Sequence, residues 1–269
     1  MFPSIRKKKV TNKTRRREML TEERKLHILK KVNTEKSVTV QELTDELGVS
    51  ESTIRRDITA LSREGKLIKV FGGAVALDEP PSSEELSVIV KESINKDEKL
   101  RIAKYAASLI MPGDYVFIDS GTTTEYMIDY ITEKHATYVT NAVSHAKDLV
   151  RKGCKVFLIG GELKENTEAV VGADAILYIQ KYHFTKGFFG TNGINIELGY
   201  TTPDVREALI KRIAIQNTQI GSRFVLADHD KFGHSSAVTF ADFGGTVVIT
   251  DKNPGKLYMK SLDIKIVDE

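Results

Sequence analysis

A run of hydroxyl-bearing residues in the middle of the chain has the types and spacing of an anion-binding loop. Asp119-Ser-Gly-Thr-Thr-Thr124 directly follows Tyr115-Val-Phe-Ile118, which is typical of a buried strand, and a helical pattern begins at Thr122. Gly121 permits a tight turn, so hydroxyls and backbone N–H groups can converge at the helix N-terminus, where the dipole favours a phosphate. A Ser/Thr-rich helix cap without a ligand is the alternative. The loop matches neither a Walker A motif nor a GxGxxG fingerprint.

Further polar residues stand where other predicted strands end, in Thr140-Asn141, Gly160-Gly-Glu162, Gly190-Thr-Asn-Gly193 and Ala227-Asp-His-Asp-Lys231. Ligands bind at the carboxyl ends of strands in open α/β sheets, so we expect one cleft, although each segment alone is ordinary turn chemistry. His229 and Lys231 are the strongest candidates for holding an anionic or hydroxylated ligand, with a solvated loop as the alternative. The predicted effector-binding residues are Asp119, Ser120, Gly121, Thr122, Thr123, Thr124, Asn141, Glu162, Asn192, Glu207, Asp228, His229 and Lys231.

Residues near the start of the chain have the spacing of a DNA-reading helix. Ser52, Arg55 and Arg56 share one helical face, whereas Ile54, Ile58 and Leu61 point into a core. Hydroxyls suit phosphates or base edges, and Arg suits guanine or phosphate. The predicted DNA-binding residues are Thr39, Ser50, Ser52, Thr53, Arg55, Arg56, Lys66 and Lys69. A small amphipathic bundle with solvated charges is the alternative.

The elements around that helix match a winged helix-turn-helix. Thr21 is the candidate N-cap of a first helix, in which the apolar residues are Leu26, Ile28, Leu29 and Val32. A second, over 40–47, has Thr39 as its candidate cap and ends at Gly48, which tolerates the left-handed conformation of a tight turn. Ser50 caps the third helix, 51–63, before a strand at 66–70 and a turn at Gly72-Gly73. Such a turn lets the N-terminal residues of the third helix enter the major groove.

The rest of the chain alternates between strands and helices, which predicts βαβ units and a mainly parallel sheet. An acidic, Pro-containing stretch at 78–85 precedes it as a linker. Asn95 and Glu98 have the spacing of a capping box at the first helix of this region. Strands are expected at 115–118, 138–140, 155–159, 187–189, 224–227 and 247–250, and helices near 144–151, 173–181 and 204–217.

Composition limits the class of protein. Residues 1–77 hold 18 Lys/Arg and 10 Asp/Glu, whereas residues 78–269 hold 22 and 27, so the basic first third predicts a polyanionic partner. No apolar run approaches the ~18 residues of a membrane span, and no secretory signal is evident. The single cysteine, Cys154, excludes a disulfide framework and a Cys-rich zinc site. We expect a cytoplasmic protein that needs no metal, cofactor or membrane.

These patterns divide the chain into a basic disordered tail (1–18), a winged helix-turn-helix DNA-binding domain (19–77), a linker (78–94) and an α/β effector and oligomerisation domain (95–269). The DNA-binding motif Val49-Ser-Glu-Ser-Thr-Ile-Arg-Arg-Asp57, with Gly65-Lys-Leu-Ile-Lys69 and Gly72-Gly-Ala74, resembles that of the DeoR family of bacterial transcriptional regulators. Many members carry Arg-Val-His where this chain has Lys69-Val-Phe71. Lys69 keeps the charge without the bidentate geometry of arginine, and Phe71 lacks a polar ring.

The second region resembles the effector domain of the same family from about Asn95 to Phe243. The matching stretches are Phe117–Thr124, Ile159–Glu162, Phe189–Ile194, Gly199–Pro203, Glu207-Ala208, Lys211-Arg212 and Leu226–Gly233. The resemblance implies a sugar-phosphate-isomerase-like fold and a homo-oligomeric (dimeric or tetrameric) repressor of a sugar operon, released from operator DNA by a phosphorylated sugar. Among the subgroups, the chain is most similar to repressors of fructose operons, whose effector is fructose 1-phosphate.

A sugar-phosphate isomerase with a DNA-binding appendage is the alternative function. Isomerisation needs a base near a proton α to a carbonyl, and Asp119, Glu207 and Asp228 are carboxylates near the predicted cleft. However, Asn192 stands where a carboxylate could have served, and no Lys-Gly-Gly-Gly segment like that of the isomerase is present. A domain that serves only oligomerisation would leave the hydroxyl-rich loop unexplained. We therefore expect a sensor without catalytic residues.

The basic tail generates a prediction about salt dependence. Removing residues 1–18 leaves 32 Lys/Arg and 36 Asp/Glu, which changes the net charge from +3 to −4. Each phosphate that the tail neutralises adds ~0.9 to the slope of log affinity against log salt. A chain beginning at Met19 is expected to keep its thermal stability, operator preference and ligand response, with a shallower slope in salt titrations. Loss of sequence discrimination would show that the tail reads DNA directly.

Overall fold

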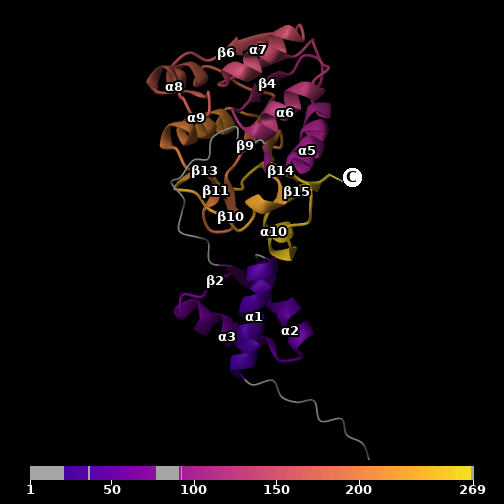
Figure 1. Cartoon of the computed structure of the whole chain (residues 1–269), viewed down its shortest axis with the longest axis vertical. Helices are drawn as coiled ribbons and strands as arrows, with labels where there is room; N and C mark the ends of the chain where they lie inside the picture. Colours follow the sequence, from indigo (N-terminus) through magenta and orange to yellow (C-terminus); the bar gives the residue numbers. More distant parts are fainter. Residues whose placement is uncertain (1–20, 36, 77–90, 92, 268–269) are drawn as a thin grey trace, which may run out of the picture.

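Three helices and a small antiparallel sheet form the N-terminal part of the molecule, at one end of its long axis (Figure 1). The computed structural model describes residues 21–35, 37–76, 91 and 93–267. The elements of this part are α1 (Thr21–Glu35), β1 (Ser37–Thr39), α2 (Val40–Leu47), α3 (Glu51–Arg63), β2 (Leu67–Val70) and β3 (Gly73–Ala76). The sheet has the order β1-β3-β2. The winged helix-turn-helix is therefore confirmed, with β1 and β3 as strands that the sequence did not indicate.

The apolar faces of the three helices meet in one core. Ile28, Leu43, Ile54 and Ile58 are buried there together. Of the apolar residues named for α1, Leu26 does not belong to this core, because it is 66% exposed. Arg24 lies inside instead, paired with Asp57 of α3.

The helix caps follow the predicted chemistry. The Thr39 hydroxyl accepts a bond from the Glu42 backbone N–H, and the Glu42 carboxylate accepts one from the Thr39 N–H at 2.8 Å. Gly48 adopts φ 63°, and the Ser50 hydroxyl accepts a bond from the Thr53 N–H. Each cap satisfies a backbone group at the end of a helix, so the angle between α2 and α3 is fixed locally.

The C-terminal part is built on a seven-stranded parallel sheet with the order β15-β14-β12-β9-β4-β5-β6. Its strands are β4 (Tyr115–Ile118), β5 (Thr137–Thr140), β6 (Lys155–Leu158), β9 (Lys186–Gly190), β12 (Arg223–Leu226), β14 (Thr246–Thr250) and β15 (Asp263–Ile266). The helices are α5 (Lys96–Ser108), α6 (Thr122–Tyr130), α7 (Val143–Arg151), α8 (Ala173–Ile179), α9 (Val205–Gln216) and α10 (Lys256–Ser261). The expected strands and helices are thus present, and β15 adds an edge strand.

Two apolar layers cover the sheet. Residues of α5 and α6 pack on one face, and residues of α8 and α9 pack on the other. The second layer includes a small antiparallel sheet, in the order β10-β11-β13, which the alternating pattern did not predict. The small elements are β7 (Glu162–Leu163), β8 (Val170–Val171), β10 (Gly193–Asn195), β11 (Gly199–Thr202), β13 (Val238–Ala241) and the 3-10 turn η1 (His229–Lys231).

The expected capping box at Asn95 is wrong. Asn95 has φ 50° and makes no side-chain cap bond; its amide donates instead to Asp228 Oδ1 at 3.1 Å and Asp230 Oδ2 at 2.7 Å. It therefore ties the start of α5 to the loop after β12. The tail, 1–18, and most of the linker, 78–94, lie outside the described residues.

Helix α10 joins the two parts (Figure 1). Lys256 Nζ lies 3.3 Å from Glu42 Oε1, and Leu257 packs against Val70 and Val75. Burial raises the pKa of Glu42, but hydrogen bonds from Thr39 and Lys256 outweigh burial and hold that pKa below its ordinary value. The residue that completes the α2 cap thus also contacts the second domain.

The Arg24–Asp57 pair generates a stability prediction. Arg24 Nε lies 2.5 Å from Asp57 Oδ2, and the two residues are 9% and 4% exposed. Removing one partner of a buried ion pair costs ~3–5 kcal/mol, because the remaining charge loses its compensation. Asp57→Ala is expected to lower the unfolding free energy of the N-terminal domain by about 3 kcal/mol in hydrogen exchange of α1 and α3. Asp45→Ala, on the exposed face of α2, serves as the control, and equal losses would contradict the assignment.

Candidate functional site

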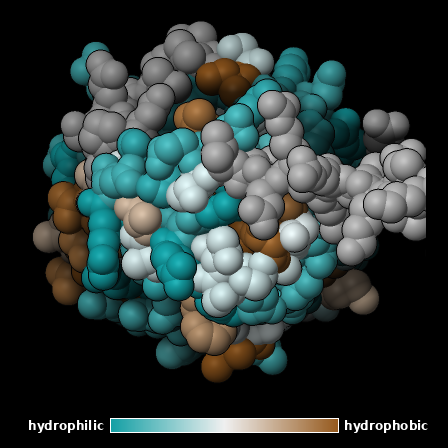
Figure 2. Space-filling view, turned by 90° about the horizontal axis from the view of Figure 1, so that it is seen from below, coloured by the Kyte–Doolittle hydropathy of each residue, from teal (hydrophilic) through white to brown (hydrophobic). Residues whose placement is uncertain are grey.

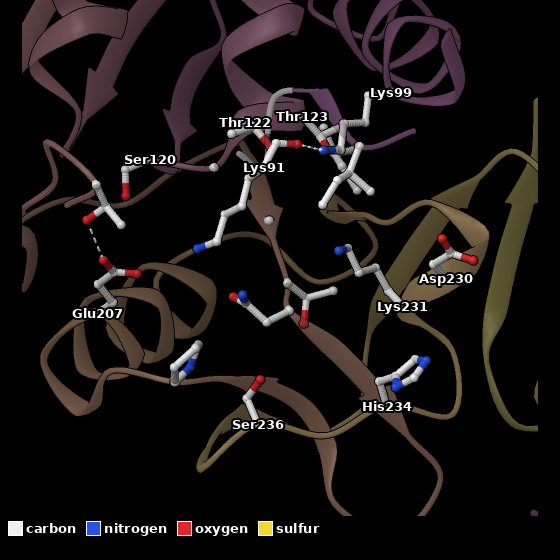
Figure 3. A pocket seen from close by; sticks show the side chains of 18 of the residues that line it. Lys91, Lys99, Ser120, Thr122, Thr123, Glu207, Asp230, Lys231, His234 and Ser236 are labelled. Atoms are coloured by element: carbon white, nitrogen blue, oxygen red, sulfur yellow. Dashed lines mark hydrogen bonds between the residues drawn. The ribbon is translucent and has the colours of Figure 1, made fainter. Parts of the chain in front are cut away.

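A pocket of about 370 Å³ opens where the strands β4, β9 and β12 end. Figure 3 shows hydroxyl and amine side chains converging on it from several elements. Seven predicted effector residues line it: Ser120, Gly121, Thr122, Thr123, Asn192, Glu207 and Lys231. Three of the five polar clusters in the sequence therefore contribute to one cleft, whereas those at 140–141 and 160–162 do not line it.

The hydroxyl-rich loop forms one wall of this pocket. Gly121 is the N-cap of α6, and Thr122 and Thr123 are the first residues of that helix. A Cβ at Gly121 would lie 3.4 Å from Gly190 Cα, so the glycine lets the ends of β4 and β9 approach closely. Thr124 does not face the pocket; its hydroxyl donates to the carbonyl oxygens of Asp119 and Gly121, both at 2.6 Å. The loop thus presents the start of α6, with its unpaired N–H groups, to the cavity.

A buried ion pair stands behind the loop. Asp119 is 1% exposed, and its carboxylate bonds Lys211 of α9 and accepts the Gly190 N–H at 3.0 Å. Lys211 Nζ also donates to Gly190 O at 3.0 Å. Asp119 itself does not line the cavity, whereas Lys211 does. The carboxylate therefore positions an amine at the pocket wall.

Glu207 of α9 also lines the pocket (Figure 3). Its Oε1 accepts bonds from Lys164 Nζ at 3.0 Å and the Thr167 hydroxyl at 2.7 Å. Asp204 caps α9 beneath it; burial raises the pKa of Asp204, but bonds from Arg206 and Lys164 hold that pKa well below its usual range. These bonds hold the Glu207 carboxylate in a fixed position at the pocket wall.

Besides Asp119 and Thr124, four other predicted residues lie outside the pocket lining. Asn141 sits behind Ser120, whose hydroxyl accepts from the Asn141 amide at 3.2 Å. Glu162 is exposed and pairs with Arg206, and Asp228 is buried beneath Asn95. His229 Nδ1 bonds Asp251 Oδ2 at 2.7 Å, so its ring is engaged by the loop after β14. With Thr124 and Asp119, these four residues can support the pocket but are not placed to contact a ligand in it.

Several pocket residues were not predicted. They are Lys91, Ile94, Lys99, Thr167, Gly190, Thr191, Pro203, Lys211, Leu226, Asp230, His234, Ser235 and Ser236. Lys91 lay in the predicted linker, and Lys99 and Lys211 lay in predicted helices. A lysine in such a place is common, so residue type alone did not indicate a place in the pocket. Lys211 follows Glu207 by one helical turn, which is the one spacing that could have linked it to the cleft.

The electrostatics of the pocket favour an anion with hydroxyl groups. Lys91 and Lys231 point into the cavity, and Lys99 Nζ donates to the Lys91 carbonyl at 2.5 Å (Figure 3). His234 and Ser236 stand on the far side. Within the described ranges, no cluster of three or more His, Cys, Asp or Glu side chains could hold a metal ion.

The N-terminal domain carries a second candidate surface on α3. Arg55 and Arg56 are exposed, and Arg55 Nη2 lies 3.0 Å from Glu51 Oε2. Ser50 Oγ lies 2.9 Å from both Ser52 Oγ and Thr53 Oγ1. The set shares one surface, but Thr39 is buried in its capping box and therefore cannot reach DNA as predicted without opening the cap.

The wing completes this surface beside α3. Lys69 Nζ contacts the Thr59 hydroxyl of α3 at 3.1 Å, and Lys66 is exposed beside Glu64. Seen from this end of the molecule, hydrophilic residues predominate and hydrophobic ones are scattered (Figure 2). Such a surface suits a polar, charged partner better than an apolar one.

Comparison with protein families matches both parts of the chain. Residues 24–80 match the DeoR-like helix-turn-helix domain, and residues 94–252 match the DeoR C terminal sensor domain. No described helix is both long enough and apolar enough to cross a membrane.

Individual relatives agree along most of the chain. The "Uncharacterized HTH-type transcriptional regulator FruR" of Bacillus subtilis is 42% identical over 233 residues, which are 86% of this chain and 91% of the relative. The "Lactose phosphotransferase system repressor" of Staphylococcus aureus is 34% identical, with coverage of 91% and 98%. Among solved structures, ribose 5 phosphate isomerase A of Neisseria gonorrhoeae aligns with a TM-score of 0.38 and 17% identity over 51% of this chain and 54% of the isomerase.

Proposed function

The chain belongs to the DeoR family of transcriptional regulators, and we propose that it represses a sugar-utilisation operon until a phosphorylated sugar releases it. One observation carries the proposal: a cationic, hydroxyl-lined pocket at the start of α6 shares a chain with an exposed, basic helix-turn-helix. Operator mobility shifts with a panel of sugar phosphates at fixed salt, including fructose 1-phosphate, test it. Release by none of them would contradict the effector assignment.

The DNA end supports sequence-specific binding. The N-terminal turn of α3 presents Ser52, Arg55 and Arg56, while its opposite face is held in the core by Ile54 and Ile58. In this family of motifs, such a turn enters the major groove and Arg can bond guanine bidentately. Lys66 and Lys69 on the wing then reach the neighbouring phosphates.

The ligand end supports a small phosphorylated sugar. The cavity of about 370 Å³ lies near the lower end of the size range for small-molecule sites. The phosphate lies at the hydroxyl and backbone N–H groups of Thr122 and Thr123, with Lys231 and Lys91 as cations. Asn192 and Glu207 bond the sugar hydroxyls.

Helix α10 supports a route between the two sites. Phe232 follows the pocket residue Lys231. Its ring packs edge-on against the ring of Tyr258 in α10, with 5.1 Å between the ring centroids. The Tyr258 hydroxyl donates to Ile194 O at 3.2 Å, while Lys256 and Leu257 contact the winged domain. A ligand that favours one position of the 229–236 loop therefore shifts the population of interdomain arrangements.

A homo-oligomer in the bacterial cytoplasm presents two recognition helices to repeated half-sites.

The same geometry supports binding without catalysis. Asp119 pairs with Lys211 behind the wall, and Asp228 does not line the pocket. Glu207 reaches the pocket but already accepts bonds from Lys164 and Thr167. A general base needs reach to the substrate proton, which Asp119 and Asp228 lack, and we assign Glu207 to holding the sugar hydroxyls. Isomerisation of sugar phosphates at enzyme-like rates, followed by NMR, would contradict this view.

The recognition helix gives a prediction about operator binding. Arg55→Ala and Arg56→Ala are each expected to weaken binding by ~1–3 kcal/mol if a bidentate base contact is lost. Fluorescence anisotropy at fixed salt measures the loss. Arg151→Ala is the matched control, because Arg151 is exposed and paired with Asp148 on α7, far from α3 (Figure 1). Wild-type affinity in both α3 variants would contradict the placement of this helix.

The hydroxyl-rich loop gives a prediction about the effector. Thr122→Ala with Thr123→Ala removes two donors at the start of α6 without adding bulk. Each lost bond to a charged group costs ~1.5–3 kcal/mol, so the variant should bind operator normally but need more sugar phosphate for release. Calorimetry measures the affinity, with exposed Thr132→Ala as the control. Undiminished affinity in the double variant would refute the loop assignment.

A further inference from the structure

Phe71 stands at the tip of the wing with its ring in water. It is the most exposed large apolar side chain among the described residues, with a relative exposure of 102%. The tip lies between β2 and β3, the two strands of the wing hairpin. The apolar residues that the domain needs for its own core are already buried elsewhere, so the fold does not use this ring.

The tip is held in place rather than free to fold back. The Val40 N–H donates to the Gly72 carbonyl at 2.9 Å, which anchors the turn to the start of α2. A Cβ at Gly73 would lie 2.1 Å from Val38 O, so the hairpin packs directly on β1. Gly72 adopts φ 83°, which glycine takes without steric cost. The backbone therefore presents residue 71 outward in a defined position.

The strand that leads to this residue contacts the effector domain on one face and α3 on the other. Ile68 and Val70 belong to the cluster around Leu257, on the side of the effector domain. Lys69 is on the other side, where its amine contacts Thr59 of α3. Phe71 follows in the turn directly after β2, two residues beyond Lys69, at the tip of the hairpin that contacts α3.

We propose that Phe71 is an apolar wedge that enters the minor groove of the operator beside the major groove that α3 reads. The proposal rests on the DNA-binding function proposed above. A hairpin beside an inserted helix lies over the next phosphate strand and the minor groove beyond it. Lys66 and Lys69 match the phosphates in charge, while a phenyl ring can insert between base pairs, unstack them and bend the duplex. The ring thereby leaves water, which accounts for an exposure that the free protein does not use.

Phe71→Ala and Lys69→Ala separate the wedge from a phosphate contact. Phe71→Ala is expected to weaken operator binding roughly 10-fold or more, because the complex loses a phenyl ring that the DNA would bury. It should also reduce operator bending, measured by fluorescence resonance energy transfer between the ends of the duplex. Its salt slope should equal that of the wild type, because no charge changes. Lys69→Ala should instead lower the slope by about 1 and leave the bend unchanged.

Three further variants complete the test. Phe71→Leu should restore most of the affinity and bend, since leucine also acts as a wedge, whereas Phe71→Gln should not. Leu26→Ala, at a 66% exposed position of α1, should change neither. Wild-type affinity and bending in Phe71→Ala, with the wild type bound to its operator, would overturn the wedge alone. A wild-type chain that binds no DNA would overturn the proposed function itself.

Discussion

The buried carboxylate of Asp119 connects three elements at the carboxyl ends of the central strands of the main sheet. It ends β4, accepts a backbone bond from Gly190 at the end of β9, and pairs with Lys211 of α9. A carboxylate that is 1% exposed is stable only when charged and hydrogen-bonding partners surround it. This requirement fixes the two strand ends and the helix relative to one another. The loop that starts α6 and the Lys211 amine are therefore already in position before any ligand arrives.

Preorganisation of this kind explains why the pocket suits recognition. The donors at the start of α6 and the acceptor Glu207 are held by contacts behind the wall, so binding does not have to order them. The loop after β12 connects the wall to other elements of the molecule. It carries Lys231 and His234 and is tied to α5 through Asn95 and to α10 through Phe232. These ties make it the natural place for ligand binding to reach the winged domain.

The sequence predicted the DNA-binding domain better than the pocket. Caps at Thr39 and Ser50, the turn at Gly48 and the inner face of α3 depend on contacts a few residues apart, and all are present. Six of the seven strands of the main sheet were also predicted, because they are short apolar runs, whereas the edge strand β15 was not. Asn95 was misjudged for the opposite reason: its partners, Asp228 and Asp230, are more than a hundred residues away.

The sequence by itself determined the order of the elements, the winged helix-turn-helix, the parallel sheet and the hydroxyl-rich start of α6, because local periodicity and short motifs encode them. Tertiary structure alone decided which polar residues share the pocket. Of the two candidate residues after β12, Lys231 reaches the cavity, whereas His229 bonds Asp251. Two further lysines of the pocket, Lys91 and Lys211, come from the segment before α5 and from α9. Spacing along the chain cannot specify such meetings, because they depend on how strand ends and helices pack across the sheet.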